Sequence, residues 1–221
     1  MNKGHDVGGQ LGFGPIPFSR EDDEAVFQAA WEARVFALTT AIDFLGKWNS
    51  DESRGATENQ KAEDYFEKSY YENWLFGLEQ LLIQKGLITP KELATGVVSL
   101  NPALKELISL RADQVEDYVY DDLSTHVHHQ RPTRFKAGDI VTTIRITSAG
   151  HTRLPRYVQG KRGKVRNHLG VHLLPDQNAL GTTVAEHCYR IFFSAAELWG
   201  SGSDEIVGVN VDLWESYLKP T

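Results

Sequence analysis

The chain has 221 residues, of which 41% are hydrophobic and 24% charged, so its composition is that of a soluble globular protein with a sizeable core. Its single cysteine, Cys188, excludes an internal disulfide and any metal site built from several cysteines of this chain. No apolar run has membrane-spanning length and the first residues lack a signal-peptide stretch, so we expect a cytoplasmic protein without a membrane partner.

The net charge of −7 is unevenly distributed along the chain. Residues 1–130 carry 11 Lys/Arg and 22 Asp/Glu, whereas residues 131–221 carry 12 and 8. The acidic part would repel phosphates, which argues against nucleic acid as a partner of the whole chain. The basic part leaves a local nucleic-acid contact open.

Residues 1–18 combine glycine and proline with apolar side chains. Five glycines and two prolines exclude a helix or a central strand in this stretch. Its apolar residues, however, are too many for a solvated tail. They are Val7, Leu11, Phe13, Ile16 and Phe18. We therefore expect an extended arm that lies on another surface, which a partner would provide.

Helical periodicity dominates the segment 19–125. Ser19 and Asp22 predict a helix start, and apolar residues then recur at steps of three and four up to Gly46. These residues are Phe27, Trp31, Val35, Leu38, Ile42 and Leu45. The polar residues 49–60 interrupt the pattern.

Three further helices are predicted in this domain. A second helix is expected over 62–85, with Gly86 as its stop. The capping box at Thr89–Glu92 opens a short third helix, and Asn101 with Pro102 opens another.

Strand patterns replace helical ones from about Phe135. Apolar and polar residues alternate in several short runs, separated by turn residues. The runs are 140–146, 163–165, 170–174, 189–193 and 206–211. We predict an α+β protein: an arm at 1–18, a helical domain at 19–125, a linker at 126–134 and a small SH3-like antiparallel β-barrel at 135–221.

Common catalytic signatures are absent from the sequence. There is no Gly-x-Ser-x-Gly, P-loop or dinucleotide fingerprint, and Cys188 lies in a predicted strand, where a buried small hydrophobe is expected. The histidines are poor metal candidates, because three of them fall in the polar linker and two flank a predicted turn, and solvated positions are favoured for both sets. They are His126, His128 and His129, and then His168 and His172.

A basic run in the second part supports an alternative function. It has no acidic residue and contains Tyr157, and it follows a Phe-x-x-Gly-Asp-x-Val motif that begins at Phe135. Its cations are Arg153, Arg156, Lys161, Arg162, Lys164 and Arg166. Such a pattern is found in RNA-binding KOW/SH3-like barrels. The sequence therefore leaves two interpretations of this run: an RNA-binding barrel with a helical extension, or a solvated hairpin on a barrel surface.

Two arginines offer a different chemistry. Arg54 lies in the polar break after the first helix and Arg153 in the second part. A guanidinium is a planar fork of donors that suits the paired oxygens of an acid. If they meet near the aromatic residues Tyr70, Tyr71 and Trp74, they would line an aromatic pocket that anchors an anion.

Short motifs along nearly the whole chain resemble those of one enzyme family. In chain order they are His5-Asp6-Val7-Gly8-Gly9, Gly12-Phe13-Gly14-Pro15, Trp31-Glu32, Asp51-Glu52-Ser53-Arg54, Tyr70-Tyr71-Glu72-Asn73-Trp74, Lys85-Gly86, Gly150-His151-Thr152-Arg153-x-Pro-x-Tyr157, Pro175-Asp176, Glu197-Leu198-Trp199-Gly200 and Val211-Asp212-Leu213-Trp214-Glu215. Together they resemble the β subunit of nitrile hydratase, and their number, order and spacing make the set specific.

The resemblance implies a lyase that hydrates small nitriles to amides only together with an α subunit, in an αβ or (αβ)2 assembly. No cofactor is expected on this chain, since the α subunit would carry Co(III), rather than Fe(III), on a loop with oxidised cysteines. Arg54 and Arg153 match the arginines that bind the cysteine oxygens. Glu58 and His151 match residues that support them. No nucleic-acid partner is implied.

The pocket is where this chain departs from the family. Tyr70, Tyr71 and Trp74 match the aromatic pocket residues, but Ser50 and Ser53 stand where members commonly have apolar residues, so a wider or more polar pocket is expected. Asn73 replaces a histidine of many cobalt members, which would weaken one supporting contact. A non-catalytic, metallochaperone-like relative is a third reading, against which the chain length argues.

Overall fold

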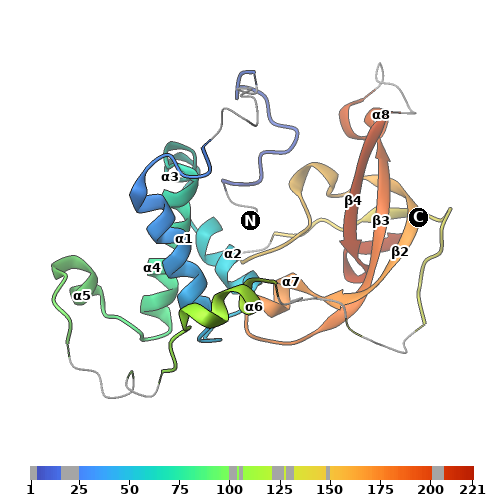
Figure 1. Ribbon diagram of the computed structural model, residues 1–221. Helices are drawn as coiled ribbons and strands as arrows, with labels where there is room; N and C mark the ends of the chain where they lie inside the picture. The colour runs from blue at the N-terminus through green and yellow to red at the C-terminus, as the bar shows by residue number, and fades with distance from the viewer. Residues whose placement is uncertain are drawn as a thin grey trace. The chain divides into compact units, whose positions relative to one another are not determined.

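A computed structural model describes residues 4–15, 25–99, 104, 107–120, 127, 132–147, 150–200 and 207–221. The chain divides into two compact units, one formed by Lys3–Asp122 and the other by Leu123–Thr221 with Met1–Asn2. The first unit is helical and the second contains an antiparallel sheet, so the chain is α+β (Figure 1). Most of the predicted linker at 126–134 lies outside the described residues. The predicted domain boundaries remain predictions.

The helical unit is built on three helices that pack together. Its helices are α1 (Ala30–Asp43), α2 (Ser50–Glu58), α3 (Ala62–Glu67), α4 (Tyr70–Gln84), α5 (Pro90–Thr95) and α6 (Val115–Tyr120), the last preceded by the 3-10 turn η3 (Ala112–Gln114). Helix α4 packs against both α1 and α2. The buried core between them consists of Trp48, Ala56, Leu78 and Leu81. No helix in the described part of the chain is long and apolar enough to cross a membrane.

Helix α2 was not predicted, because its sequence is almost entirely polar. Its start is fixed by a capping box: the Asn49 side chain accepts the backbone N–H groups of Asp51 and Glu52, at 3.0 and 2.9 Å. The Glu52 carboxylate accepts the Asn49 N–H in return, at 2.9 Å. One apolar residue, Ala56, reaches the core. Capping and a single buried contact therefore replace the apolar face on which the prediction relied.

Two other helix predictions were wrong at their boundaries. The predicted start at Ser19 lies outside the described residues and stays a prediction. Phe27, which the first helix was expected to include, precedes α1, which begins at Ala30, where the Glu32 carboxylate accepts the N–H of Ala29 at 3.4 Å. The helix predicted over 62–85 is divided into α3 and α4, because the Ser69 hydroxyl caps a new helix by accepting the Glu72 N–H at 3.4 Å. A local cap has overridden a continuous apolar pattern.

The predicted stops and the short third helix are confirmed. Gly46 and Gly86 have φ values of +58° and +68° after the ends of α1 and α4, a conformation that favours glycine. The capping box at Thr89 opens α5 with Pro90 as its first residue. The helix predicted from Asn101 lies largely outside the described residues, and residues 107–110 are not helical.

The second unit contains five antiparallel strands in the order β4-β3-β2-β1-β5. They are β1 (Ile140–Thr143), β2 (Arg162–Leu173), β3 (Ala185–Ser194), β4 (Gly208–Trp214) and β5 (Leu218–Pro220). Short helices α7 (Pro175–Asn178) and α8 (Ala195–Trp199) and the 3-10 turns η4 (Arg156–Val158) and η5 (Glu215–Tyr217) complete the unit. The outer strands β4 and β5 do not pair in the described residues, so the sheet is not closed as a barrel would be.

Strand β2 is one long strand, although two short ones were predicted. It pairs with β3 along its length, with register shifts between Val165 and Asn167 and between His168 and Gly170. The expectation that His168 and His172 flank a turn was therefore wrong, since both lie within the strand. Two irregularities blur the alternation of apolar and polar residues on which the prediction depended.

Candidate functional site

Helix α2 carries four of the predicted site residues. Arg54 is exposed and lies one helical turn before Glu58, so both belong to the same helix face. The Glu58 side chain is only 12% exposed. Ser50 is exposed at the first position of the helix, and Ser53 is half-buried beside Arg54. Ala56, on the far side of the helix, is buried in the core, whereas Arg54 is exposed to solvent.

The predicted pocket residues Tyr70, Tyr71 and Trp74 lie together in the first turns of α4. Their ring centroids are 5.2 Å (Tyr70–Tyr71), 5.6 Å (Tyr70–Trp74) and 5.8 Å (Tyr71–Trp74) apart. Two residues that were not predicted extend the group: Phe27 lies 5.4 Å from Tyr71, and Phe36 lies 6.2 Å from Trp74. We call these five residues the aromatic cluster.

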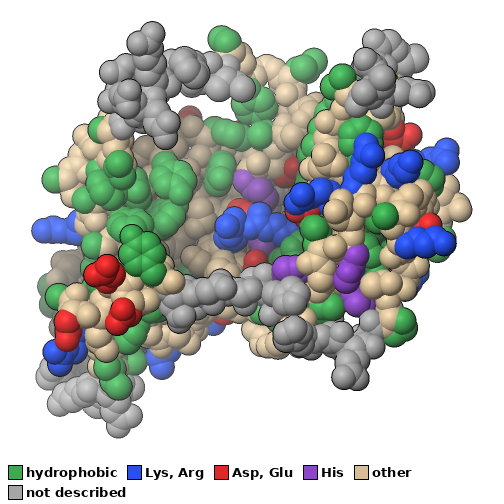
Figure 2. All heavy atoms as spheres, turned by 45° about the vertical axis from the view of Figure 1, so that its right-hand side comes forward, with side chains coloured by type: hydrophobic (Ala, Val, Ile, Leu, Met, Phe, Trp, Pro, Cys, Tyr) green, Lys and Arg blue, Asp and Glu red, His purple; other side chains and the backbone are tan. Residues whose placement is uncertain are grey.

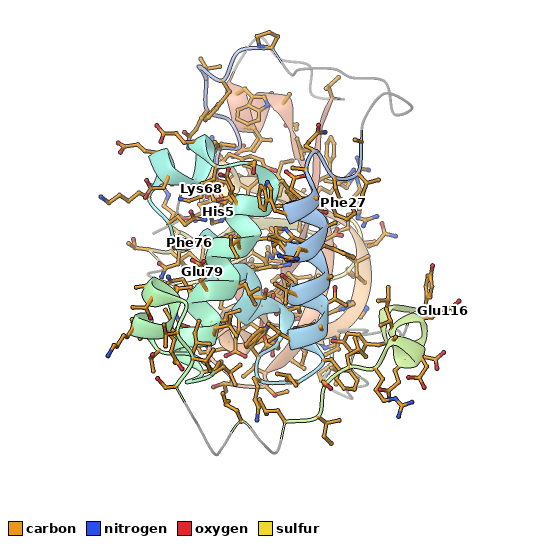
Figure 3. The ribbon with its side chains drawn as sticks, turned by 60° about the vertical axis from the view of Figure 1, so that its left-hand side comes forward. His5, Phe27, Lys68, Phe76, Glu79 and Glu116 are labelled. Atoms are coloured by element: carbon orange, nitrogen blue, oxygen red, sulfur yellow. The ribbon has the colours of Figure 1, made fainter. Side chains whose placement is uncertain are left out.

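The aromatic cluster is partly open to solvent. Tyr70 is 66% exposed and Phe36 is 41% exposed. Figure 2 shows hydrophobic side chains gathered on this face of the helical unit, and Figure 3 shows Phe27 beside the start of α1. Phe27 has the helical spacing noted in the sequence, whereas Phe36 lies off that apolar face and no periodic signal marks it. The cluster offers a ring-lined surface rather than a closed cavity.

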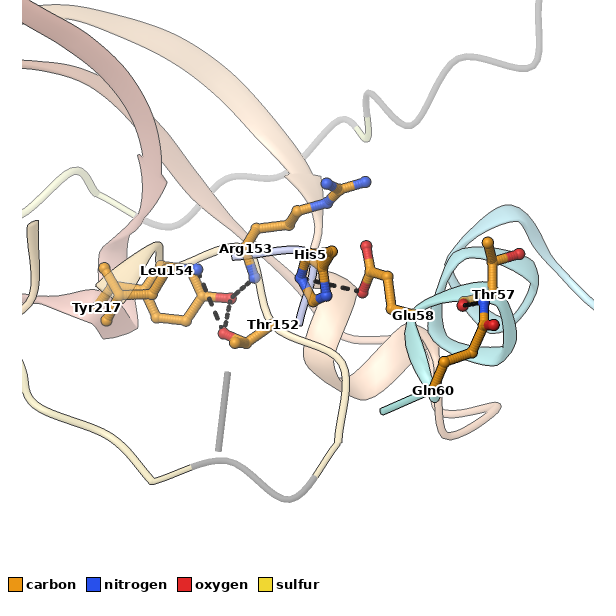
Figure 4. Close-up of polar contacts among 8 residues, drawn as sticks. All are labelled: His5, Thr57, Glu58, Gln60, Thr152, Arg153, Leu154 and Tyr217. Carbon is orange, nitrogen blue, oxygen red and sulfur yellow. Dashed lines mark hydrogen bonds and ion pairs between the residues drawn. The ribbon is translucent and has the colours of Figure 1, made fainter. Parts of the chain in front are cut away.

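Asn73 has a structural role under the cluster. It is buried, and its side chain accepts a hydrogen bond from the Gln60 amide at 2.8 Å. It also donates to the backbone carbonyl of Tyr65 at 3.0 Å. Gln60 in turn donates to the Thr57 carbonyl at the end of α2, at 2.7 Å (Figure 4). The Asn73 side chain on α4 is therefore bonded directly to α3 and, through Gln60, to the end of α2.

The start of the chain also reaches α2. The His5 Nε2 atom lies 3.6 Å from a Glu58 carboxylate oxygen. The His5 ring meets that of Tyr65 edge-on, with centroids 6.2 Å apart. Burial raises the pKa of the Tyr65 hydroxyl, and the Glu58 carboxylate raises it further. Periodicity could not find His5, because it lies in a glycine-rich stretch without helix or strand.

In the second unit, the backbone around Arg153 is held by Tyr217. The Arg153 N–H and the Thr152 hydroxyl donate to the Tyr217 hydroxyl oxygen at 3.4 and 3.5 Å (Figure 4). The Tyr217 hydroxyl in turn donates to Asp176. Burial raises the pKa of Tyr217, and Asp176 adds to the rise. His151 is buried two residues before Arg153. The segment is thus fixed through its main chain, and the Arg153 side chain stays half-buried.

Three residues of the basic run lie on the outer face of β2. Arg162, Lys164 and Arg166 are exposed and alternate with the buried Gly163 and Val165. The Arg166 guanidinium lies 4.5 Å from the centre of the Phe192 ring on β3. This alternation is typical of a solvated strand face, and nothing in the described residues of the unit favours RNA binding over it.

Nucleophile and metal chemistry is not evident in the described part of the chain. There, no group of three or more His, Cys, Asp or Glu residues is arranged to hold a metal. Burial raises the pKa of the Cys188 thiol to about 12, and Asp212 adds to the rise, so the thiolate is scarce at neutral pH. A small pocket in the second unit contains none of the predicted site residues. It is lined by Arg134, Val171, Ala185, Glu186, His187, Glu215 and Ser216.

Comparisons with known proteins cover nearly the whole chain. The family model of the nitrile hydratase β subunit, N-terminal part, matches residues 1–116, and that of the C-terminal part matches 124–220. A nitrile hydratase subunit β of Pseudomonas putida is 34% identical, over 100% of both chains. A cobalt-containing nitrile hydratase subunit β of Pseudonocardia thermophila is 36% identical, over 99% of this chain and 96% of its own. The low-molecular weight cobalt-containing enzyme's subunit β from Rhodococcus rhodochrous is 35% identical, over 98% of each.

Proposed function

This chain belongs to the nitrile hydratase β-subunit family, and we propose that it completes, with an α subunit, an active site that hydrates small nitriles to amides. The observation that carries the proposal is the match of both family models along the chain, with full-length relatives at 34–36% identity. A β subunit implies an α subunit as partner. The assembly is αβ or (αβ)2, in the cytoplasm.

In this proposal Arg54 and Arg153 bind the oxygens of oxidised cysteines on the α subunit. A guanidinium fork fits such paired oxygens better than a lysine does. The exposure of Arg54 on a capped helix and the fixed backbone at Arg153 support these roles. Glu58 and His151, both largely buried, support the arginines.

The metal belongs to the α subunit in this proposal. Two of the relatives are named cobalt-containing, which favours Co(III) over Fe(III). When bound, such a metal supplies Lewis-acid polarisation of the nitrile. The residues of this chain orient the partner's loop and enclose the substrate.

The substrate pocket comprises Ser50, Ser53, Tyr70, Tyr71 and Trp74, with Phe27 and Phe36 completing its wall. The ring contacts of the aromatic cluster support an apolar lining, and the two serines add hydroxyl groups beside Arg54. A small organic nitrile suits such a lining, because pockets of this kind bind apolar groups and orient them with few polar atoms.

Two structural parts of the proposal concern the arm and the sheet. The arm at 1–18 would wrap the α subunit, which is supported by the 98% exposure of Leu11. The second unit would be an SH3-like barrel that is open between β4 and β5 in the described residues, and the pairing of the last strand, β5, with the first, β1, supports it. The domain limits 19–125, 126–134 and 135–221 belong to the same proposal.

Co-expression with an α subunit tests the proposed function. We expect Arg54→Lys to lower kcat by about 100-fold, since a point charge replaces a donor fork. Arg111→Lys is the matched control: Arg111 is a surface arginine paired with Asp113, and its replacement should leave kcat unchanged. Nitrile hydration by this chain without an α subunit, or normal turnover of Arg54→Lys, would overturn the proposal.

A further inference from the structure

We propose that His5 is a positioning residue of the site: its imidazole holds Glu58, and thereby fixes the end of the helix that carries Arg54. The inference rests on the proposed function of Arg54. It assigns a part in catalysis to the start of the arm, which otherwise serves only to contact the partner. The two side chains and their contact are shown in Figure 4.

The contact between His5 and Glu58 is electrostatic. At 3.6 Å the two atoms are too far apart for a hydrogen bond but within ion-pair distance. Their side chains are 25% and 12% exposed, respectively. Water and salt therefore screen the pair less than they would a pair on the open surface.

The chain around His5 is folded rather than loose. We call residues 4–10 the arm root. Its backbone turns twice, with the Val7 N–H donating to the His5 carbonyl at 3.1 Å and the Gln10 N–H to the Val7 carbonyl at 2.9 Å. The Gln10 side chain donates to the carbonyl of Asp6, which is 8% exposed. These bonds place the imidazole at Glu58 without the help of a helix or strand.

Gly4 brings the arm root against α3. A Cβ atom at this position would lie 2.4 Å from the Ala62 Cα atom, far inside van der Waals contact. Because the obstructing atom belongs to the backbone, a rotamer change cannot relieve the overlap. Glycine is therefore required for the close approach that sets the position of His5.

Glu58 is placed where it needs a positive neighbour. It is the last residue of α2, and the negative end of the helix dipole disfavours a carboxylate there. When it is protonated, the His5 imidazole beside Glu58 offsets this repulsion. Without His5, we expect this contact to be lost and the last turn of α2 to fray more readily. In a helix of nine residues, fraying from that end reaches Arg54, one turn away.

The αβ complex with its metal is the material for the test. We expect His5→Leu to lower kcat about 10-fold with KM unchanged, the size typical of residues that support a metal site from outside. The metal content and the α:β ratio should not change. Hydrogen exchange of the α2 amides should speed up. His172→Leu, which removes a half-buried imidazole in β2, is the matched control and should keep kcat.

A double-mutant cycle separates positioning from simple stabilisation. If His5 acts through Glu58, His5→Leu should add no further loss of kcat to Glu58→Gln. If it only stabilises the arm, the assembled complex should keep its kcat although it unfolds earlier. Should His5→Leu fail to assemble, His5→Asn removes the imidazole while keeping a polar side chain, and the same loss is expected.

The outcomes distinguish this proposal from the proposed function. Impaired Arg54→Lys with normal His5→Leu, or additive losses in the cycle, would overturn the role of His5 alone. Normal turnover of Arg54→Lys would overturn both. Gly4→Ala gives a second measure, because it should displace an intact imidazole and reproduce the His5→Leu loss.

Discussion

The helical unit and the sheet unit differ in the size of their buried cores. The sheet unit has one continuous core of thirteen buried residues in its described part, whereas the described helical unit has a cluster of four. The helical unit also exposes large apolar side chains on α1, namely Trp31, Phe36 and Leu38. Exposed apolar groups of this kind mark surfaces that another molecule covers. The sheet unit thus has the larger buried core, whereas the helical unit exposes apolar side chains on α1 that the proposed α subunit would cover.

Arg54 and Arg153 lie one in each unit, and they are supported in different ways. Arg153 follows a backbone fixed by the buried Tyr217. Arg54 sits on a short polar helix that depends on the Asn49 cap, on Ala56 and on the arm root. The first arrangement relies on hydrogen bonds to a buried tyrosine of the sheet unit and the second on a helix cap and contacts within the helical unit, so the two arginines should respond to different substitutions.

Core truncation should produce the largest contrast between the units. Leu213→Ala and Leu81→Ala each remove a buried side chain, 0% and 2% exposed, and should cost about 3 kcal/mol of unfolding free energy. Hydrogen exchange under rising urea should show Leu213→Ala weakening only the sheet unit and Leu81→Ala only the helices. If both substitutions weaken both units equally, the units do not unfold independently.

Asn73→Leu should break the polar links of the helical unit. It leaves the Gln60 amide and the Tyr65 carbonyl without this partner in a buried setting, which should cost about 2 kcal/mol. Thermal unfolding of the chain measures the loss. Asn210→Leu on the exposed face of β4 is the control and should be nearly neutral. An equal effect of both would show that the buried amide links contribute nothing.

Tyr217→Phe should have a smaller effect in the sheet unit. It removes the hydroxyl that accepts from Arg153 and Thr152 and donates to Asp176. Since Asp176 is half-exposed and can bind water instead, we expect a loss of about 1 kcal/mol. Turnover of the complex should fall more than stability does. A Tyr120→Phe control, at a residue that is 82% exposed, should change neither stability nor turnover. Unaltered turnover of Tyr217→Phe would show that Tyr217 does not act through Arg153.

Thiol labelling gives the smallest expected signal in the native state. Because the pKa of Cys188 is raised to about 12, its thiol stays protonated at all pH values well below 12 and should not react with a disulfide reagent at pH 8. Reaction should begin only when urea opens the sheet unit, and at the same rate in Leu81→Ala as in the parent. Rapid labelling of the native chain would contradict the burial of this strand.

Periodicity predicted the parts of the fold that have an apolar face. It found most of α1 and α4, the stop at Gly86 and the regions of β1, β3 and β4. It missed α2, whose only core residue is Ala56, although the Asn49–Glu52 capping box was readable in the sequence. It also divided β2, where two register shifts disturb the alternation. Local caps and bulges therefore decided the remaining elements.

The candidate site was less accessible to prediction than the fold. The chemistry of Arg54 and Arg153 could be argued from the guanidinium group, but their roles came from the resemblance to a family. Contacts between residues distant in sequence, such as His5 with Glu58 and Tyr217 with Asp176, leave no periodic trace. Phe36 lies off the apolar face of α1 and became visible only through its contact with Trp74.

The close packing of Gly4 against Ala62 also has a consequence for the order in which the parts of the helical unit fold. The arm root packs against α3 through Gly4, so during synthesis it cannot pack until α1, α2 and the start of α3 have left the ribosome. This closure raises the contact order of a unit that is otherwise built from local helices. The arm root should therefore be the last part of the helical unit to become protected during refolding, and any tag fused before it has to leave Gly4 free to close.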